Sequence, residues 1–391
     1  MFVSLVGILL TFGKVESSDG SWQRVTSVDF SRDGRYLALG GYCGRHVAVG
    51  GFRGVDKDLR YRVLLIDLSQ PDSAPHVLED DSALPVTQWF GCPGRSAPFS
   101  PDGKTLATGS LSDSLRLWNL ETFSSTQAPI RGSVILRTVT FSTDGKTLVA
   151  AGDDDIFFCR LDSGVVQHKF ADDYRHNFGH LRAIDFSPDG RLLAVGSRGI
   201  TDVIDVNTLK SIHQFSDVES SRYASVAFSP DGSTLAVSGR ENMHLWRAKD
   251  WIARTIPRPI GAMILGLAFA PDGATLAVGG AGGLVLLDLA TGFPIGEPLS
   301  SNSIDSVAIS ADGRLLVAGD EEGNATLWDL KNRKTLRTFP VIRYPGGVSL
   351  FVPIGILGAW FAAAMILRRR RAAELFKLPA AIHSQDSQSS Q

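Results

Sequence analysis

The residues best suited to metal chemistry lie in one short segment, ADDYRHNFGH. Carboxylate and imidazole groups are common zinc ligands, and the segment supplies both kinds in Asp172, Asp173, His176 and His180. A helix would bring His176 and His180 onto one face, but the segment precedes a strand and is expected to be a loop. The spacing does not favour a metal site, and we predict no metal and no other cofactor.

A second carboxylate cluster is formed by Asp153, Asp154 and Asp155. We expect it at a turn between two strands, where acidic side chains are usually solvated, and its spacing does not match a calcium loop. The sequence also has no Gly-x-Ser-x-Gly elbow, no Walker loop, no Cys-x-x-Cys pair and no His-Glu-x-x-His motif. These observations indicate a binding protein rather than an enzyme.

The elements that position these residues come from a short phrase that returns seven times. An apolar residue precedes a Ser-x-Asp-Gly turn, with Ala for Ser in one copy, and a run of Leu, Ala, Val and Gly follows it. The turn aspartates are Asp33, Asp102, Asp144, Asp189, Asp231, Asp272 and Asp312. Asp and Gly favour tight turns, so each phrase predicts a hairpin. A period of about forty residues indicates a repeat architecture.

Each predicted hairpin is followed by a third strand, such as LWDL at Leu327, and by a polar connection with room for a fourth strand. The middle strands are apolar runs without polar alternation, which predicts burial on both faces. Their small residues would let neighbouring sheets approach a common axis.

These features resemble the WD-repeat family of β-propellers over Thr26 to Ile342. The resemblance implies an all-β fold, a seven-bladed β-propeller of four-stranded antiparallel blades, over residues 21–342. The family's buried hydrogen-bond network is expected to be incomplete, because its Gly-His pair occurs once, at His180, where it implies a structural role. Trp occupies the signature position only in Trp118, Trp246 and Trp328.

The C-terminal part predicts a membrane anchor. Residues 348–367 are apolar and uncharged, and a helix of this length spans about 30 Å, the thickness of the hydrocarbon core. The basic and then polar tail, residues 368–391, begins with Arg368, Arg369, Arg370 and Arg371. By the positive-inside rule we expect a single-pass protein with a cytoplasmic tail and an extracytoplasmic propeller.

Two smaller features bear on this topology. Residues 1–20 form an apolar leader, which is either a signal sequence or a strand that closes the propeller. In the second case the propeller would face the cytoplasm on a tail anchor. Gly355, Ala359 and Ala363 recur every four residues, which predicts a helix-pairing face and a homodimer through the membrane helix.

Two insertions interrupt the first repeat and the connection after it, and the resemblance places both on one face. They contain side chains that interface hot spots favour, and we predict that they bind a protein partner. These residues are Arg45, His46, Phe52, Arg53, Trp89 and Phe90. The alternative is that Trp89 and Phe90 pack the insertion onto its blade.

The three cysteines fall into two groups. Cys159 occupies a Trp position and is expected to be a buried small apolar residue. Cys43 and Cys92 lie in or beside the insertions, and we predict either a disulfide between them, if the domain is exported, or two free thiols.

The function predicted is therefore a membrane-anchored protein-interaction scaffold. A net charge of −2 shows no basic excess, so no nucleic-acid partner is expected. The Trp-poor repeats and compact anchor favour a bacterial source. The alternative is an exported hydrolase or lactonase-like propeller, for which the innermost strands offer Asp185 and Asp305 but no set of histidines.

Overall fold

The structure is a computed structural model, and it describes residues 22–339 with short gaps. The gaps are 44–47, 50–51, 54–59, 71–72, 80–97, 110–114, 129, 131–135, 153–154, 171–180, 198–199, 217–224, 240–241 and 262. The chain divides into two compact units, Met1–Pro345 and Gly346–Gln391, and the second lies wholly outside the described residues.

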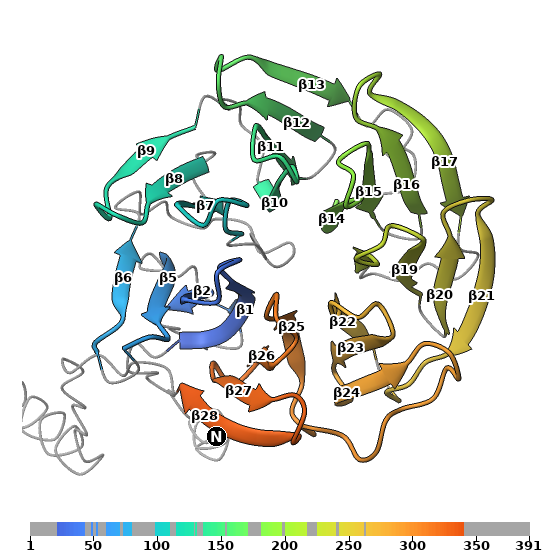
Figure 1. Cartoon of the computed structure of the whole chain (residues 1–391). Helices are drawn as coiled ribbons and strands as arrows, with labels where there is room; N and C mark the ends of the chain where they lie inside the picture. Colours follow the sequence, from blue (N-terminus) through green and yellow to red (C-terminus); the bar gives the residue numbers. More distant parts are fainter. Residues whose placement is uncertain are drawn as a thin grey trace, which may run out of the picture. The chain divides into compact units, whose positions relative to one another are not determined.

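The first unit is a seven-bladed β-propeller, with its antiparallel sheets arranged around a common axis (Figure 1). The strands of blades 1 to 3 are β1 (Trp22–Phe30), β2 (Tyr36–Cys43), β5 (Arg60–Asp67) and β6 (His76–Glu79); β7 (Thr105–Gly109), β8 (Leu115–Asn119) and β9 (Ser125–Gln127); β10 (Leu136–Phe141), β11 (Thr147–Gly152), β12 (Asp155–Arg160) and β13 (Val166–Phe170). A two-stranded hairpin, β3 (Ala48–Val49) with β4 (Phe52–Arg53), is inserted between β2 and β5.

The remaining four blades repeat the same order from the axis outward. Their strands are β14 (Ala183–Phe186), β15 (Leu192–Gly196), β16 (Ile200–Asp205) and β17 (Lys210–Ser216); β18 (Val226–Phe228), β19 (Thr234–Ser238), β20 (Asn242–Arg247) and β21 (Ile252–Pro257); β22 (Ile264–Phe269), β23 (Thr275–Gly280) and β24 (Gly283–Asp288); β25 (Ile304–Ile309), β26 (Leu315–Asp320), β27 (Ala325–Asp329) and β28 (Lys334–Phe339). The predicted four-stranded plan is therefore confirmed in outline.

Two blades depart from four regular strands. In blade 2 the described part of the innermost segment, which begins at Pro98, forms a bridge between Phe99 and Leu106. In blade 6 the outer segment pairs with β24 only through isolated bridges at Pro294 and Ser300. Pro294 and Pro298 have no backbone N–H to donate, which explains why a regular fourth strand does not form there.

The predicted hairpin turns are confirmed, and their side chains hold them closed. Ser187 Oγ donates to Asp189 Oδ1 (2.6 Å) and accepts the backbone N–H of Leu192 (2.9 Å). Gly190 has a φ of +72°, as the other turn glycines do within a few degrees, and this left-handed conformation is why glycine stands there. The Ser187 hydrogen bond is the main reason that the pKa of Asp189 is lowered.

Seven hydrophobic clusters hold the ring together, and each joins two neighbouring blades. The second strands are almost fully buried, as predicted from their apolar runs. A Cβ added at Gly279 of blade 6 would lie 2.7 Å from Ile304 Cγ2 of blade 7. Small residues therefore do allow neighbouring sheets to approach, as expected.

The first and last blades are each built from one continuous part of the chain. Blade 1 takes its four strands from Trp22–Glu79, and blade 7 takes its four from Ile304–Phe339. β1 packs directly against β25 and β26. The leader proposed as a closing strand lies outside the described residues, so its role stays a prediction.

The signature positions of the repeats have a local structural function. Asp205 Oδ1 accepts the backbone N–H of Thr208 (2.8 Å), and Asp288 and Asp329 cap their own turns in the same way. Trp118 donates its indole N–H to Thr108 Oγ1 (2.9 Å), which is one buried link of the network that the family resemblance implied.

The predicted membrane helix at 348–367 lies outside the described residues, together with the basic cluster Arg368–Arg371 and the pairing face at Gly355, Ala359 and Ala363. Across the part of the chain that is described, no helix is long and apolar enough to span a bilayer.

Candidate functional site

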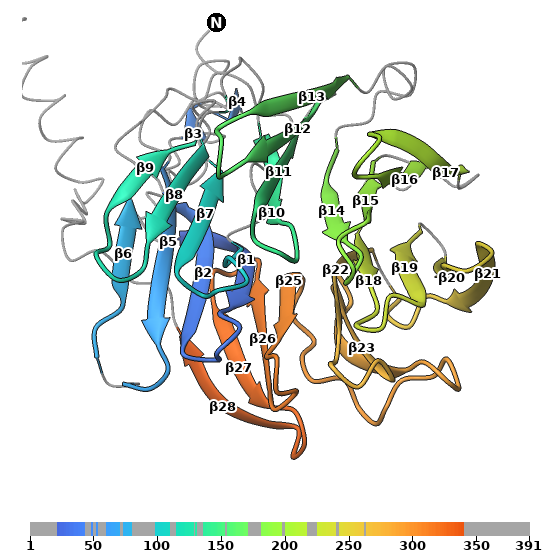
Figure 2. The same cartoon turned by 45° about the horizontal axis from the view of Figure 1, so that its top comes forward.

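The propeller has two faces that differ in their connections. The Ser-x-Asp-Gly turns and the turns into the fourth strands share one face, which we call the turn face. In an antiparallel blade β2 and β6 run in the same direction, so both end at the opposite face, the insertion face. Figure 2 shows the β3–β4 hairpin at one end of the propeller, beyond the strands of blade 1.

Most of the predicted partner-binding residues lie outside the described residues, namely Arg45, His46, Trp89 and Phe90. Phe52 and Arg53 form β4, in which Phe52 pairs with Val49 of β3. Cys43 ends β2, and Cys92 lies in an undescribed segment, so the predicted disulfide is untested. Cys159 is fully buried among apolar residues, as predicted, and burial raises the pKa of its thiol.

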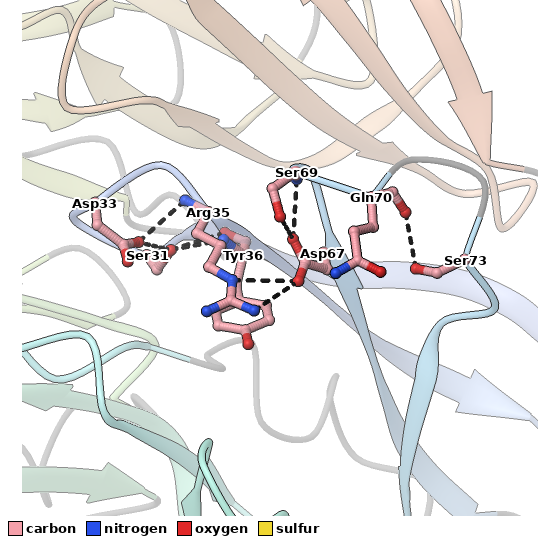
Figure 3. A network of polar contacts seen from close by, with 8 residues as sticks. All are labelled: Ser31, Asp33, Arg35, Tyr36, Asp67, Ser69, Gln70 and Ser73. Atoms are coloured by element: carbon pink, nitrogen blue, oxygen red, sulfur yellow. Dashed lines mark hydrogen bonds and ion pairs between the residues drawn. The ribbon is translucent and has the colours of Figure 1, made fainter.

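A polar network on the turn face of blade 1 involves the signature aspartate Asp67 (Figure 3). The Arg35 guanidinium donates from Nη2 to Asp67 Oδ2 (3.0 Å), and Ser69 Oγ donates to Asp67 Oδ1 (2.5 Å). The Ser69 hydrogen bond, followed by the Arg35 hydrogen bond, lowers the pKa of Asp67. The Arg35 contact ties the β1–β2 turn to the β5–β6 turn, and the Ser69 contact lies within the β5–β6 turn, so the network is structural.

The innermost strands line an open cavity of about 360 Å³, which we call the axial cavity. Its lining includes Ser27 and Asp29 from β1, Asp185 from β14, Phe228 from β18, Leu267 from β22 and Val307 from β25. Blade 2 contributes Pro98. Most of the lining residues are apolar in type, but the exposed surface of the cavity is mainly polar, and blades 1 and 4 supply its two carboxyl groups.

The two carboxyl groups have the same local structure. Asp29 accepts the backbone N–H of Phe30 at Oδ1 (2.9 Å) and that of Phe99 in blade 2 at Oδ2 (3.1 Å). Asp185 Oδ2 accepts the backbone N–H of Phe228 in blade 5 (2.7 Å), and the carboxylate also accepts the N–H of Phe186. Each aspartate therefore links its own blade to the next one.

Both carboxyl groups titrate near neutral pH. Desolvation deep within the ring raises the pKa of Asp29 and that of Asp185 to about 7 each, although the backbone hydrogen bonds act in the opposite direction. Carboxyl groups with perturbed pKa values in a concave site mark a candidate functional site.

For the alternative enzyme hypothesis, the sequence offered two carboxylates on the innermost strands, Asp185 and Asp305. Asp185 does line the cavity, whereas Asp305 of β25 is buried (3 % exposed) and is not among the lining residues. Asp29 was missed. It precedes Phe30 as Asp185 precedes Phe186, so alignment of the repeats on their turns would have found it.

The predicted metal-chemistry segment with Asp172, Asp173, His176 and His180 lies outside the described residues, as do Asp153 and Asp154. Asp155 begins β12, and its Oδ1 lies 2.9 Å from His168 Nε2 rather than in solvent as expected. His168 in turn stacks on Phe157. In the described ranges no three His, Cys, Asp or Glu residues gather closely enough to hold a metal ion.

The fold and its repeated turns define the class of this protein as a seven-bladed β-propeller. The family described as "WD domain, G-beta repeat" matches residues 95–119, 173–200 and 296–329. These stretches contain two of the signature tryptophans, Trp118 and Trp328. The matches and the seven blades together support a WD-repeat propeller. No curated protein matches the chain.

Proposed function

We propose that this protein is a membrane-anchored scaffold that binds a protein partner through the insertion face of its propeller. WD-repeat propellers commonly act as protein-interaction scaffolds, because a rigid closed ring can present variable loops. The observation that carries the proposal is the β3–β4 hairpin. It is added to blade 1 without interrupting the β1-β2-β5-β6 sheet, as a binding element on a finished scaffold would be.

Site-directed cross-linking in the full-length protein tests this surface. A photoactivatable residue at Phe52, on the β3–β4 hairpin, is compared with one at Arg32, which is exposed on the turn face. We expect a discrete cross-linked protein only from position 52. Equal adducts from both positions, or none from position 52, would exclude the insertion face as the binding surface.

The anchor and the orientation are separate parts of the proposal. The uncharged segment 348–367 followed by Arg368–Arg371 supports a single membrane span with a cytoplasmic tail and an extracytoplasmic propeller. Fusions after Gln391 test it, one to a fluorescent protein that folds only in the cytoplasm and one to a phosphatase active only outside it. Fluorescence without phosphatase activity is the expected result, and the reverse result contradicts the orientation.

A further inference from the structure

We propose that the axial cavity binds a small organic diammonium ion, with Asp29 and Asp185 holding its two ends. This site is distinct from the insertion face and depends on different residues. The ligand is defined by its chemistry, two ammonium groups joined by a short aliphatic chain.

Comparison of the repeats shows that the two aspartates are not required by the fold. The position before the last residue of the innermost segment is not acidic in the other five blades. It holds Pro98, Thr140, Ala227, Ala268 and Ala308. Those blades join their neighbours without a carboxyl group, and a desolvated carboxylate is costly unless it is compensated. A structural link alone therefore does not explain Asp29 and Asp185.

The arrangement places the two carboxyl groups to face one ligand. Strands β1 and β14, which carry them, lie on opposite sides of the propeller axis (Figure 1). The backbone N–H groups of Phe99 and Phe228 fix the two side chains from the next blades. A carboxylate oxygen that accepts one backbone N–H keeps a second acceptor site, which an ammonium N–H can use.

Ser27 provides an independent indication of a ligand. It lines the same cavity and is 1 % exposed, and its Oγ has no hydrogen-bond partner among the residues described. Buried hydroxyl groups nearly always have a partner, so an unsatisfied one needs an explanation. An ammonium group held by Asp29 would supply it, because Ser27 and Asp29 lie two residues apart on β1 and alternate residues share a face of a strand.

The remaining lining defines the rest of the ligand. Among the described residues the lining contains neither Lys nor Arg, and an ammonium group of the ligand would supply the positive charge that two ionised carboxylates favour. The other blades supply non-titratable side chains, among them Pro98, Phe228, Leu267, Phe269 and Val307. The apolar side chains among them can contact methylene groups between the two charged ends, although the cavity surface also has a large polar share. A cavity of about 360 Å³ accommodates a short chain.

Isothermal titration calorimetry of the full-length protein at pH 8 tests the proposal with 1,4-diaminobutane as the probe. The matched probes are 1,4-butanediol, which has the same length without charge, and butylamine, which has one ammonium group. We expect 1,4-diaminobutane to bind, butylamine to bind at least about tenfold more weakly, and butanediol to give no signal. Since the cation binds the ionised carboxylates, affinity should rise between pH 6 and pH 8.

Substitutions separate binding from folding. Asp29→Asn and Asp185→Asn should each lower the affinity at least about tenfold, whereas Asp250→Asn, on the exposed outer part of blade 5, should leave it unchanged. Ala268→Leu keeps both carboxyl groups and narrows the cavity, so it should weaken binding in a protein whose circular dichroism is unchanged. It serves as the decisive variant if the Asn variants fail to fold.

Three results would overturn the proposal. The first is the absence of binding of 1,4-diaminobutane at pH 8, and the second is unchanged affinity in Ala268→Leu. The third concerns the source of the ammonium group: if Nα-acetyl-lysine methylamide binds more tightly than the diamine, the site takes a lysine side chain of a protein instead. None of these results bears on cross-linking at Phe52, so the scaffold function is tested separately.

Discussion

Gly319 of β26 lies directly against Val25 of β1, at the contact where the last blade meets the first. A Cβ built on Gly319 would be 2.4 Å from Val25 Cγ1 and 2.8 Å from the Val25 carbonyl oxygen. Neither neighbour can move freely, because the carbonyl belongs to the backbone and Val25 is buried in the cluster shared by blades 1 and 7. The ring can therefore close here only around a residue without a side chain.

We predict that Gly319→Ala destabilises the propeller by about 1–3 kcal/mol, the usual cost of overpacking a filled core. The reason is that blades 1 and 7 must separate to admit the methyl group. Thermal unfolding of the full-length protein, followed by near-ultraviolet circular dichroism, measures the effect.

The control for this substitution is Gly261→Ala. No atom lies within 4 Å of a Cβ added at Gly261, and its φ is not in the left-handed region. Its melting temperature should match that of the unsubstituted protein. Equal melting temperatures for both Ala variants would show that closure tolerates a side chain at Gly319.

In the Ser-x-Asp-Gly turns, the serine hydroxyl can be removed in one blade and added in another. Ser187→Ala removes the hydroxyl that joins Asp189 to the N–H of Leu192, and we expect a loss of about 1 kcal/mol. Blade 6 has Ala270 at the equivalent position, where Asp272 accepts the N–H groups of Ala274 and Thr275 itself. Ala270→Ser should therefore be neutral or stabilising. A loss of stability in Ala270→Ser larger than that in Ser187→Ala would contradict the role given to the hydroxyl.

The repeats made the fold predictable, because each local signal agreed with the global plan. The Asp-Gly turns, the apolar second strands and the period of about forty residues each specify part of a blade, and the structure confirms all three. Cys159 was correctly placed in the core, because its position in the repeat is one that other blades fill with Trp.

The candidate site was harder to predict because it is formed between blades. Asp29 and Asp185 are 156 positions apart in the sequence numbering, and only ring closure brings them to one cavity. The pairing of Asp155 with His168 was missed for a similar reason, since it depends on the register of β12 with β13. The positions of acidic residues along the sequence therefore did not indicate that Asp29 and Asp185 share a cavity or that Asp155 pairs with His168.

Trp118 and Thr108 form a buried side-chain hydrogen bond, which can be removed by substituting Thr108 alone. Thr108→Val keeps the shape of the side chain but leaves the indole N–H without an acceptor, so we expect a loss of about 1–3 kcal/mol. Thr108→Ser retains the hydroxyl and serves as the control, with a smaller loss from the missing methyl group. Urea unfolding monitored by Trp fluorescence measures both. If Ser were as destabilising as Val, packing rather than the hydrogen bond would account for the effect.

Asp185 should make the stability of the propeller depend on pH in the direction opposite to that of the turn aspartates. Burial raises the pKa of Asp185 from 3.8 to about 7, so between these values the folded protein binds a proton that the unfolded chain has lost. The stabilisation is complete below pH 3.8 and is lost as pH rises through 7. From pH 5 to pH 8 the loss attributable to this one group is roughly 2–3 kcal/mol.

Asp185→Asn cannot titrate, so its free energy of unfolding should fall less than that of the unsubstituted protein between pH 5 and pH 8. Asp189→Asn is the contrasting variant, because the pKa of Asp189 is lowered, mainly by Ser187. The free energy of unfolding of Asp189→Asn should be lower than that of the unsubstituted protein. This difference should be largest at neutral pH and shrink as the pH falls through the acidic range. Chemical denaturation at half-unit pH intervals, without added amines, compares the three proteins. Parallel curves for Asp185→Asn and the unsubstituted protein would mean that Asp185 is ionised throughout and that the axial cavity is well solvated.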